Sequence, residues 1–544
     1  MSDISDDVIH HESKIGGEGG GGLPVAVVGA GPVGLTTALG LAHYRVPFLL
    51  LEEDDQLSSD TKAGTVLTRS LEIWHRYGCV GDVLAGALRV DEIGDLERAT
   101  NQSRTPVRLD TLTDDTRFPF VINIPQYQLE PILRAALERA GGSLLSRHRL
   151  ESFTCHDDRV TLQVSTPDGP VEIAASHLLA CDGGRSTVRG QLGSPVVGHT
   201  LPEKYLVVDF LVDLDVANPR DYPYLAYFSD PQEWMVLIRQ PDCWRFLFPQ
   251  STAEPPAEAE LLAKARRFIG DVDRIEVRSA VVYPVHQRVA QHWSAGGRVF
   301  LMGDAAHLVT PMWALGLNTG MLDASNLPWR LAWVRRGWAD PALLAGYEQE
   351  QQPVAAKGSA EMAEQARLAM AHQRERVLLP SDDWALARTR SLLGVRLDVD
   401  GSGDWSMVTP AGGPQPVRPG DRLPDLRLFG ARGEIRLHDL TRDRFAALYL
   451  TDVRRRPAVP GNGSPALGHW AVSRWDAPLD SGLRDRALLD VGGRATARLG
   501  LPPDTMLLVR PDQHVAAVRP ISPDAAEEAY RQVTGRPLPE VSDA

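Results

Sequence analysis

The chain of 544 residues has little lysine and no excess of positive charge. Only five of its 57 basic residues are lysines, and its formal net charge is −14. This acidic balance disfavours binding to a phosphate backbone, so no nucleic-acid partner is expected. No apolar run approaches the roughly 20 residues that a membrane-spanning helix needs, and the acidic N-terminus lacks the apolar core of a signal peptide. We therefore expect a cytoplasmic protein with no membrane partner.

Cysteine is equally scarce. The four cysteines lie far apart in the sequence, at Cys79, Cys155, Cys181 and Cys243. No CxxC or metal-type spacing occurs, which excludes a disulfide scaffold and gives no reason to expect a metal site. Because no cysteine follows Cys243, thiol redox chemistry in the C-terminal half is excluded.

The overall composition and two segments rich in glycine predict a chain with two ordered parts. Hydrophobic residues make up 43% and charged residues 24%, as in ordinary globular proteins. Residues 1–22 are polar and end in a glycine cluster, which predicts a disordered leader. Residues 401–424 are rich in glycine and proline and predict a linker between parts 23–400 and 425–544. Several strand patterns with almost no helix signal predict an antiparallel sheet within about 200–290.

A glycine turn follows the first apolar strand pattern. Gly29 permits a tight turn, Gly31 lets the backbone approach a pyrophosphate, and Gly34 lets the next helix pack on the strand. The helix start, next to Pro32, presents N–H groups and a positive dipole end to phosphates. A second strand pattern ends at Glu52, whose carboxylate suits a ribose 2′-OH, although a solvated acid at a strand end is the alternative. The pattern predicts a Rossmann-like domain that binds an adenine dinucleotide.

Two further turns with an aspartate follow later strand patterns. The first reads DGGRSTVR at 182–189, and the second reads GDAAH at 303–307. Each is typical of a strand end where the backbone approaches a ligand and a carboxylate lies at the mouth. Each taken singly is explained equally well by a turn followed by a helix cap.

Together, in this order and spacing, the three motifs resemble those of the FAD-dependent aromatic hydroxylases, the single-component flavoprotein monooxygenases typified by p-hydroxybenzoate hydroxylase and phenol hydroxylase. The resemblance covers residues 23–400 and implies a mixed α/β fold, with a Rossmann-like FAD-binding domain interleaved with an antiparallel substrate sheet. It implies that Asp182 and Gly183 lie near FAD and the nicotinamide coenzyme, that Arg185 contacts the coenzyme, and that Asp304 contacts the FAD ribose.

More positions match the family. The segment from Lys62 to Ile73 resembles the stretch that runs past the pyrophosphate and the flavin, with Lys62 where the family usually has arginine. Gln126 matches a glutamine near the flavin. For Arg69 and Gln126 the alternatives are a surface residue at a helix start and a turn residue. The cofactor-binding residues expected are Gly29, Gly31, Pro32, Gly34, Glu52, Lys62, Arg69, Gln126, Asp182, Gly183, Arg185, Asp304, Pro311, Gly316, Leu317 and Asn318.

One segment departs from the family. Residues 311–320 read PMWALGLNTG, where the family normally reads PPxGGxGMNTG. The final part is kept, and the resemblance implies that its backbone N–H groups face the flavin. Trp313 and Ala314 replace a glycine pair, so a bulky ring is expected on the substrate side. Trp313 and Tyr224 are the candidate substrate residues. His307 is interpreted as part of a turn, and no side chain is assigned as the catalytic base.

Residues 425–544 resemble the thioredoxin-like domain that the phenol hydroxylase branch carries after its flavin domain. Because this segment has no cysteine, it has no CxxC motif, and we interpret it as a packing or dimerisation element. A homodimer is the candidate assembly.

The resemblance implies an NAD(P)H-dependent FAD monooxygenase that hydroxylates a phenolic or polyketide-like aromatic through a C4a-hydroperoxyflavin. FAD would be bound tightly and non-covalently, NADPH or NADH transiently, and the other partners would be O₂ and a small aromatic substrate. One alternative keeps these cofactors but performs a Baeyer–Villiger oxidation or an epoxidation of a polycyclic substrate. The remote alternative is a flavin-binding protein without catalysis.

Overall fold

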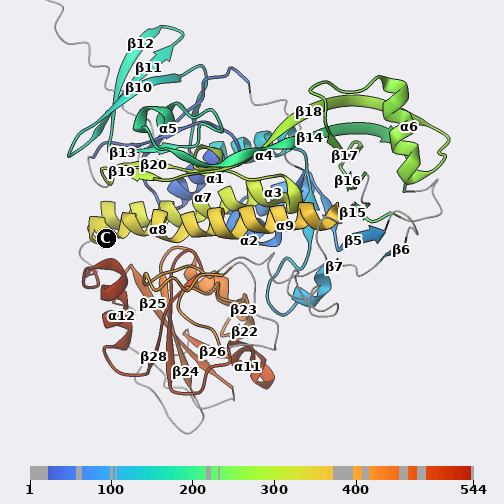
Figure 1. Ribbon diagram of the computed structural model, residues 1–544. Helices are drawn as coiled ribbons and strands as arrows, with labels where there is room; N and C mark the ends of the chain where they lie inside the picture. Colours follow the sequence, from blue (N-terminus) through green and yellow to red (C-terminus); the bar gives the residue numbers. More distant parts are fainter. Residues whose placement is uncertain are drawn as a thin grey trace, which may run out of the picture.

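The computed structural model describes residues 22–56, 64–97, 102–103, 107–215, 222–230, 233–371, 396–406, 416–451, 463–474 and 486–540. The expected mixed α/β fold is confirmed: an N-terminal part built on two large sheets lies above a C-terminal part built on a third sheet (Figure 1). The predicted leader lies outside the described residues except for residue 22, and the domain boundaries stay a prediction. None of the helices in the described ranges is long and apolar enough to cross a membrane.

A six-stranded sheet forms the base of the N-terminal part and is parallel except at one edge. Its strands in spatial order are β19 (Ser294–Ala295), β20 (Val299–Leu301), β13 (His177–Ala180), β1 (Val25–Val28), β2 (Phe48–Leu51) and β9 (Leu144–Leu145). Every residue of β1 and β13 is buried, as expected for parallel strands covered on both faces. Helix α1 (Pro32–His43) packs against α4 (Gln126–Arg139) and α7 (Leu315–Arg335).

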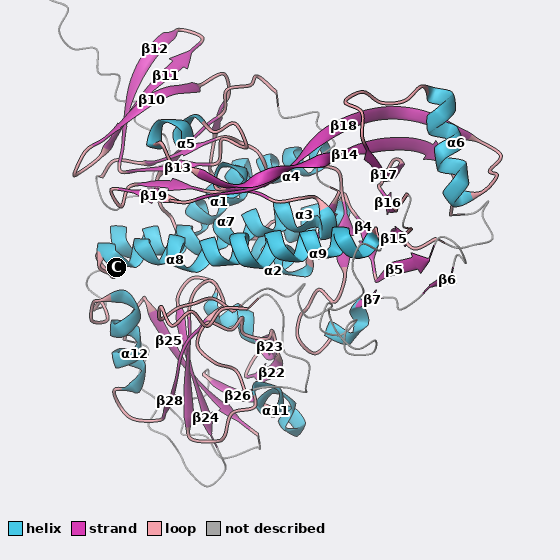
Figure 2. Cartoon of the chain, viewed as in Figure 1, coloured by secondary structure: helices cyan, strands magenta, loops and turns pink. Residues whose placement is uncertain are grey.

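A larger sheet contains the strands of the region about 200–290, where the sequence predicted an antiparallel sheet. Its strands in order are β21 (His307–Leu308), β18 (Ile275–Ala290), β14 (Val196–Val212), β17 (Trp244–Gln250), β16 (Met235–Arg239), β15 (Leu225–Ser229), β5 (Glu92–Glu97) and β6 (Gln102–Ser103), with β7 (Val107–Arg108) beside β5. All pairs are antiparallel except β5 with β15. The long strands β14 and β18 run out from the parallel sheet to helix α6 (Glu258–Ile269), as Figure 2 shows.

Shorter elements complete the N-terminal part. A second antiparallel sheet contains β10 (Arg149–Cys155), β11 (Val160–Thr166) and β12 (Gly169–Ala175), and a third contains β3 (Thr65–Val66), β8 (Val121–Asn123) and β4 (Leu88–Val90). The remaining helices are α2 (Thr68–Arg76), α3 (Val80–Ala85), α5 (Thr187–Leu192), α8 (Gly346–Pro353) and α9 (Ala360–Met370), with a π-helical turn at Val354–Ser359. Short 3₁₀ turns occur at Leu109–Leu112, Gly303–Ala305, Met312–Ala314 and Pro341–Ala345.

In its described residues, the C-terminal part is a mixed sheet with two α-helices. Its strands in order are β23 (Gly433–Arg436), β22 (Arg427–Gly430), β26 (Ala487–Leu489), β25 (Leu467–Ser473), β24 (Phe445–Thr451), β27 (Thr505–Val509) and β28 (Val515–Pro520). The helices are α11 (Arg494–Leu499) and α12 (Ala525–Thr534), and 3₁₀ turns lie at Leu437–Thr441 and Val491–Gly493. The thioredoxin-like assignment stays a prediction.

An aromatic cluster joins the two parts into one core. Phe445 on β24 lies edge-on to Trp329 and Trp333 of α7, with ring centroids 5.6 and 5.8 Å apart. Tyr530 of α12 packs on the other side of Phe445 at 5.2 Å. All four rings are essentially inaccessible to solvent. Separating the parts would therefore expose a large apolar surface to water.

Buried ion pairs accompany this cluster. Arg510 donates two hydrogen bonds to Glu350 of α8, at 2.7 and 2.9 Å, and also pairs with Asp512. Arg330 of α7 contacts the same Glu350 carboxylate at 2.7 Å. The indole N–H of Trp329 donates to Asp512 at 3.1 Å. Each buried carboxylate in this group thus has an arginine partner, as buried charges require.

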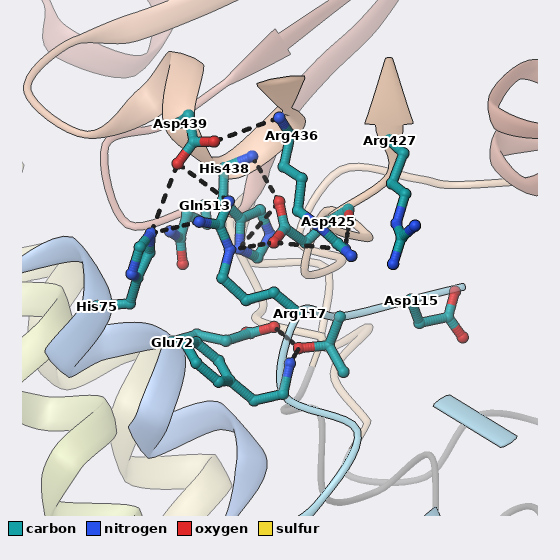
Figure 3. Close-up of polar contacts among 12 residues, drawn as sticks. Glu72, His75, Asp115, Arg117, Asp425, Arg427, Arg436, His438, Asp439 and Gln513 are labelled. Carbon is teal, nitrogen blue, oxygen red and sulfur yellow. Dashed lines mark hydrogen bonds and ion pairs between the residues drawn. The ribbon is translucent and has the colours of Figure 1, made fainter. Parts of the chain in front are cut away.

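A second set of ion pairs lies between α2 and the start of the C-terminal part. Arg117 reaches from the N-terminal part to the carboxylates of Asp425 and Asp439, at 2.8 and 3.0 Å (Figure 3). Glu72 of α2 is fully buried and pairs with Arg422. Residues 416–424, predicted as linker, also make backbone hydrogen bonds with Leu499, Gln513 and Val515. This segment is therefore held against both parts.

Candidate functional site

One cavity of about 590 Å³ runs from the carboxyl ends of the parallel strands to the face of the larger sheet. At one end it begins at the glycine turn after β1. A Cβ on Gly34 would lie 1.9 Å from the carbonyl oxygen of Gly29, so the start of α1 packs directly on the turn. Gly29 has a φ of 97°, which favours glycine. A Cβ on Gly31 would meet nothing within 4 Å, so the backbone there is open to a ligand.

The predicted acid at the end of β2 holds this turn in place. Glu52 accepts hydrogen bonds from the backbone N–H groups of Ala30 at 2.6 Å and Asp54 at 3.1 Å. Its side chain lines the cavity, and so does Pro32 at the first position of α1. A carboxylate with such a position can still accept a hydrogen bond from a ribose hydroxyl. Glu52 therefore stabilises the glycine turn, in addition to the ribose contact predicted from the sequence.

The DG turn follows β13 on the same edge of the sheet. Asp182, Gly183 and Arg185 all line the cavity. Asp182 accepts a hydrogen bond from the N–H of Val188 at 3.1 Å through one oxygen, while its other oxygen is buried with no partner. Burial raises the pKa of this carboxyl and outweighs the hydrogen bonds that lower it. A buried acceptor without a protein partner can accept a hydrogen bond from a ligand or a water molecule.

The GD turn follows β20 and is fixed from behind. Asp323 of α7 accepts hydrogen bonds from the N–H of Gly303 at 2.8 Å and pairs with His307 at 2.9 Å. Asp304 instead lines the cavity. Arg189 ties this turn to the DG turn through the carbonyl oxygens of Ala305 and Gly184. His307 is buried away from the cavity lining, which agrees with its interpretation as part of the turn.

The start of α7 closes the cavity from another side. Pro311, Gly316 and Leu317 line it, and the first N–H groups of a helix have no partner within that helix. Asn318 does not line the cavity. Its amide bonds to the N–H of Leu67 at 2.9 Å and the hydroxyl of Ser70 at 2.7 Å, so it joins α7 to the start of α2. Gln126 also lines the cavity and donates to Glu130 at 2.7 Å.

Two other residues were predicted to bind the cofactor, and the structure describes only one of them. Lys62 lies outside the described residues. Arg69 is buried and absent from the cavity lining, because its guanidinium bonds to Gln513 at 2.5 Å and to the carbonyl oxygen of Asp512 at 2.7 Å. Successive residues on a helix point about 100° apart, so Ser70 faces Asn318 of α7 while Arg69 faces the C-terminal part. The expectation that Arg69 contacts the cofactor is therefore not met by its position.

The far end of the cavity is an apolar wall on one face of the larger sheet. It consists of Val207, Leu225, Tyr227, Val236, Ile238 and Leu247, with Arg245 among them. Arg245 is held by Asp209 through two hydrogen bonds, at 2.8 and 3.0 Å. The sequence analysis assigned none of these residues. The alternation of the pairs 225/227, 236/238 and 245/247 along three strands is the signal that places them on one face.

The two predicted substrate residues lie beside this wall and not in it. Tyr224 precedes β15, and its ring lies edge-on to Trp244 at 6.0 Å. Neither Tyr224 nor Trp313 lines the cavity, whereas Tyr227 does. The ring of Trp313 packs against Tyr227, with centroids 4.3 Å apart. Strand alternation thus replaces Tyr224 with Tyr227 as the aromatic side chain that faces the cavity.

The residues present fit an FAD molecule. The packed glycine turn leaves room for a pyrophosphate, and the Glu52 carboxylate suits the adenosine ribose. The unpartnered oxygen of Asp182 can accept a hydrogen bond from a bound molecule. Within the described ranges, no three His, Cys, Asp or Glu side chains converge in a way that could hold a metal ion.

The chain belongs to the family described as "FAD binding domain", whose model matches residues 22–361. Residues 417–537 match a second model, described as "Aromatic-ring hydroxylase, C-terminal". FAD is therefore the cofactor, as the sequence predicted.

Curated relatives include 3-(3-hydroxy-phenyl)propionate/3-hydroxycinnamic acid hydroxylases. The protein of Escherichia coli (strain K12 / DH10B) is 34% identical over 337 residues, which are 60% of this chain and 59% of that protein. The protein of Burkholderia cenocepacia (strain HI2424) is 35% identical over 336 residues, 60% of each chain. The chain thus matches less than two thirds of the length of these relatives.

Solved structures extend the likeness over nearly the whole chain. A ternary complex of aklavinone-11 hydroxylase with FAD and aklavinone has a TM-score of 0.77 and 26% identity, covering 94% of this chain and 99% of that one. An anhydrotetracycline hydroxylase from Streptomyces rimosus has a TM-score of 0.70 and 26% identity, covering 95% and 100%. Both parts of the fold therefore occur together in these hydroxylases.

Proposed function

We propose that the protein is an NAD(P)H-dependent FAD monooxygenase that hydroxylates a phenolic or polyketide-like aromatic compound. The observation that carries the proposal is a single cavity that joins a dinucleotide-binding turn to an apolar wall containing Tyr227 and Arg245. The names of the relatives support an aromatic substrate, since they include hydroxylases of phenolic acids and of polycyclic compounds. The balanced reaction is ArH + O₂ + NAD(P)H + H⁺ → ArOH + NAD(P)⁺ + H₂O.

When bound, FAD supplies the hydride acceptor and the site of O₂ activation. The chain supplies binding and placement. Gly29, Gly31 and Glu52 hold the adenosine and pyrophosphate end, and Asp182 and Asp304 bind along the middle. The N–H groups at Gly316 and Leu317 begin a helix, so they favour negative charge on a ring placed before them.

The apolar wall has two roles in this proposal. Val207, Val236 and Leu247 would exclude water from the reacting ring, which limits unproductive release of hydrogen peroxide. Arg245, held by Asp209, places a positive charge beside an ionised substrate oxygen and thereby favours the electron-rich phenolate form.

The deciding experiment begins with the absorption spectrum of the purified protein, followed by NAD(P)H consumption in air with phenols, naphthols and anthraquinones. We expect a flavin spectrum, and with one substrate a product that gains one oxygen atom from ¹⁸O₂. Coenzyme oxidation that yields only hydrogen peroxide with every compound would contradict the hydroxylase. A product with oxygen inserted into a C–C bond, or an epoxide, would establish the alternative oxidation.

Three further expectations are part of the same proposal. O₂ is the second substrate, the chain forms a homodimer, and the location is cytoplasmic. The mass of the flavin-loaded protein in solution, measured by size-exclusion chromatography with light scattering, tests the dimer: a value near 60 kDa would contradict it, since one chain has a mass of 59.5 kDa.

A further inference from the structure

The backbone at the start of α7 is strained. Trp313 has φ 65° and ψ 14°, and Ala314 has φ 57° and ψ 29°. For a residue with a Cβ this left-handed region is unfavourable relative to ordinary helical geometry. Two such residues in succession therefore store strain that a glycine pair would avoid. Backbone strain retained beside a ligand cavity points to a functional reason for the side chain.

The side chain of Trp313 makes one close ring contact. Its indole packs against the Tyr227 ring with centroids 4.3 Å apart and planes inclined by 33°, the shortest ring separation among the described residues. Such an aromatic pair is stabilised beyond the burial of its area. Tyr227 lies in β15 between paired neighbours on β16 and β5, so its backbone is fixed by two strands. The indole packs against this ring and restricts its orientation.

The Tyr227 ring forms part of the cavity wall, whereas the indole lies behind it. Tyr227 is 5% exposed and lines the cavity next to Leu225 and Val236. Trp313 is not in the lining, although its neighbours Pro311 and Ala314 are. Any effect of Trp313 on a bound molecule must therefore pass through Tyr227.

We propose that Trp313 is a positioning residue that holds Tyr227 as a flat stacking surface for a planar aromatic substrate. The proposal deepens the proposed function, because it assigns the apolar wall to the substrate. A fixed aromatic ring selects ligands with a complementary flat face, since offset stacking requires parallel planes at close distance. A tyrosine free to rotate would accept bent and planar ligands alike.

The test compares two phenols of similar size on FAD-loaded protein. 2-Naphthol is planar throughout, whereas 5,6,7,8-tetrahydro-2-naphthol has a puckered second ring. Equilibrium dialysis gives the Kd of each. We expect the unsubstituted protein to bind 2-naphthol at least fivefold more tightly, W313G to bring the ratio of the two Kd values close to one, and W313F to retain at least half of the preference. The matched control is W470A, a tryptophan replacement on β25 in the C-terminal part, which should leave the ratio unchanged.

Several outcomes would overturn the proposal. They are equal affinity for both phenols in the unsubstituted protein, no binding of either, or a preference in W313G that matches the unsubstituted protein. Should W313G fail to fold or to bind FAD, a double-mutant cycle of W313A with Y227L carries the test: W313A must bring the ratio of the two Kd values close to one while Tyr227 is present and must leave the ratio unchanged in Y227L. The proposed function fails separately, because peroxide without hydroxylated product would contradict hydroxylation while leaving the Kd ratios readable.

Discussion

Buried carboxylates of the cavity and of the interface between the two parts differ in their partners. In the cavity, one oxygen of Asp182 is buried with no protein partner. At the interface, Glu72, Glu350, Asp425 and Asp512 each meet at least one arginine. An unpaired buried acceptor is costly and persists where a ligand completes it, whereas a paired charge holds two surfaces in one arrangement.

The pKa values of carboxyl groups at the interface and in the cavity are shifted in opposite directions. Burial alone would raise the pKa of Glu350, but the charges of Arg330 and Arg510 outweigh it and lower the pKa to about 2. For Asp182 burial prevails and the pKa is raised. The pKa values of the two carboxyls thus shift in opposite directions, because arginines pair with Glu350, whereas burial is the largest influence on Asp182 and hydrogen bonds oppose it only in part.

The largest effect expected is from removal of the C-terminal part. A chain ending at Ser406 would expose the rings of Trp329 and Trp333 and leave Glu72 and Glu350 without the cations Arg422 and Arg510. We expect it to be insoluble or unfolded, as measured by soluble yield and circular dichroism. A soluble fragment that binds FAD would show that the N-terminal part folds alone and that the interface adds little.

The next largest effect is expected from removal of a single charge at the interface. Glu350→Ala leaves Arg330 and Arg510 buried without their shared partner, and removing one member of a buried ion pair costs about 3–5 kcal/mol. The free energy of unfolding from urea titration measures the loss. The control is Glu276→Ala, since Glu276 pairs with Arg274 on the surface and such pairs contribute about 0–1 kcal/mol. Equal losses in the two variants would refute the contrast.

In the cavity the corresponding change is Glu52→Ala. It removes an acceptor for the ribose and for the N–H of Ala30, so FAD affinity should fall by about 1–3 kcal/mol. Fluorescence titration of the apoprotein with FAD measures it. Asp55→Ala, an exposed acid outside the cavity lining, is the control and should match the unsubstituted protein. Unchanged FAD affinity in Glu52→Ala would remove this residue from the site.

Acid should weaken the interface before the carboxylates are protonated. Burial lowers the pKa of His438 and of His514 to about 4. An unfolded histidine has a pKa near 6.5, so the unfolded chain binds protons first and stability falls as the pH drops from about 7 towards 4. The expected loss is on the order of 1 kcal/mol per histidine between pH 7 and 5. Urea titrations at several pH values measure it, and a flat profile would contradict the lowered pKa values.

The local parts of the site were predictable from the sequence, and the distant ones were not. Gly29, Gly34, Asp182 and Asp304 lie in short motifs whose geometry follows from the strand and turn that contain them. The position of Arg69 depends on a partner far along the chain, Gln513, which no local pattern reveals.

The apolar wall shows a second reason why the sequence alone does not predict the whole site. Its residues alternate along their strands, but only the pairing of β15, β16 and β17 decides which face meets the cavity. For the same reason Tyr227, and not Tyr224, faces the cavity. The fold class followed from element order and the glycine turn, because these are properties of the chain itself.

Helix α2 touches both regions of the molecule. Ser70 bonds to Asn318 at the start of α7, and the adjacent Arg69 bonds to Gln513 in a turn of the C-terminal part. Because both residues lie on the same helix, we expect a ligand that lowers the mobility of α7 to lower the mobility of that distant turn as well. The backbone amides of residues 510–514 should accordingly exchange their hydrogens with solvent more slowly once FAD is added, although they lie outside the cavity.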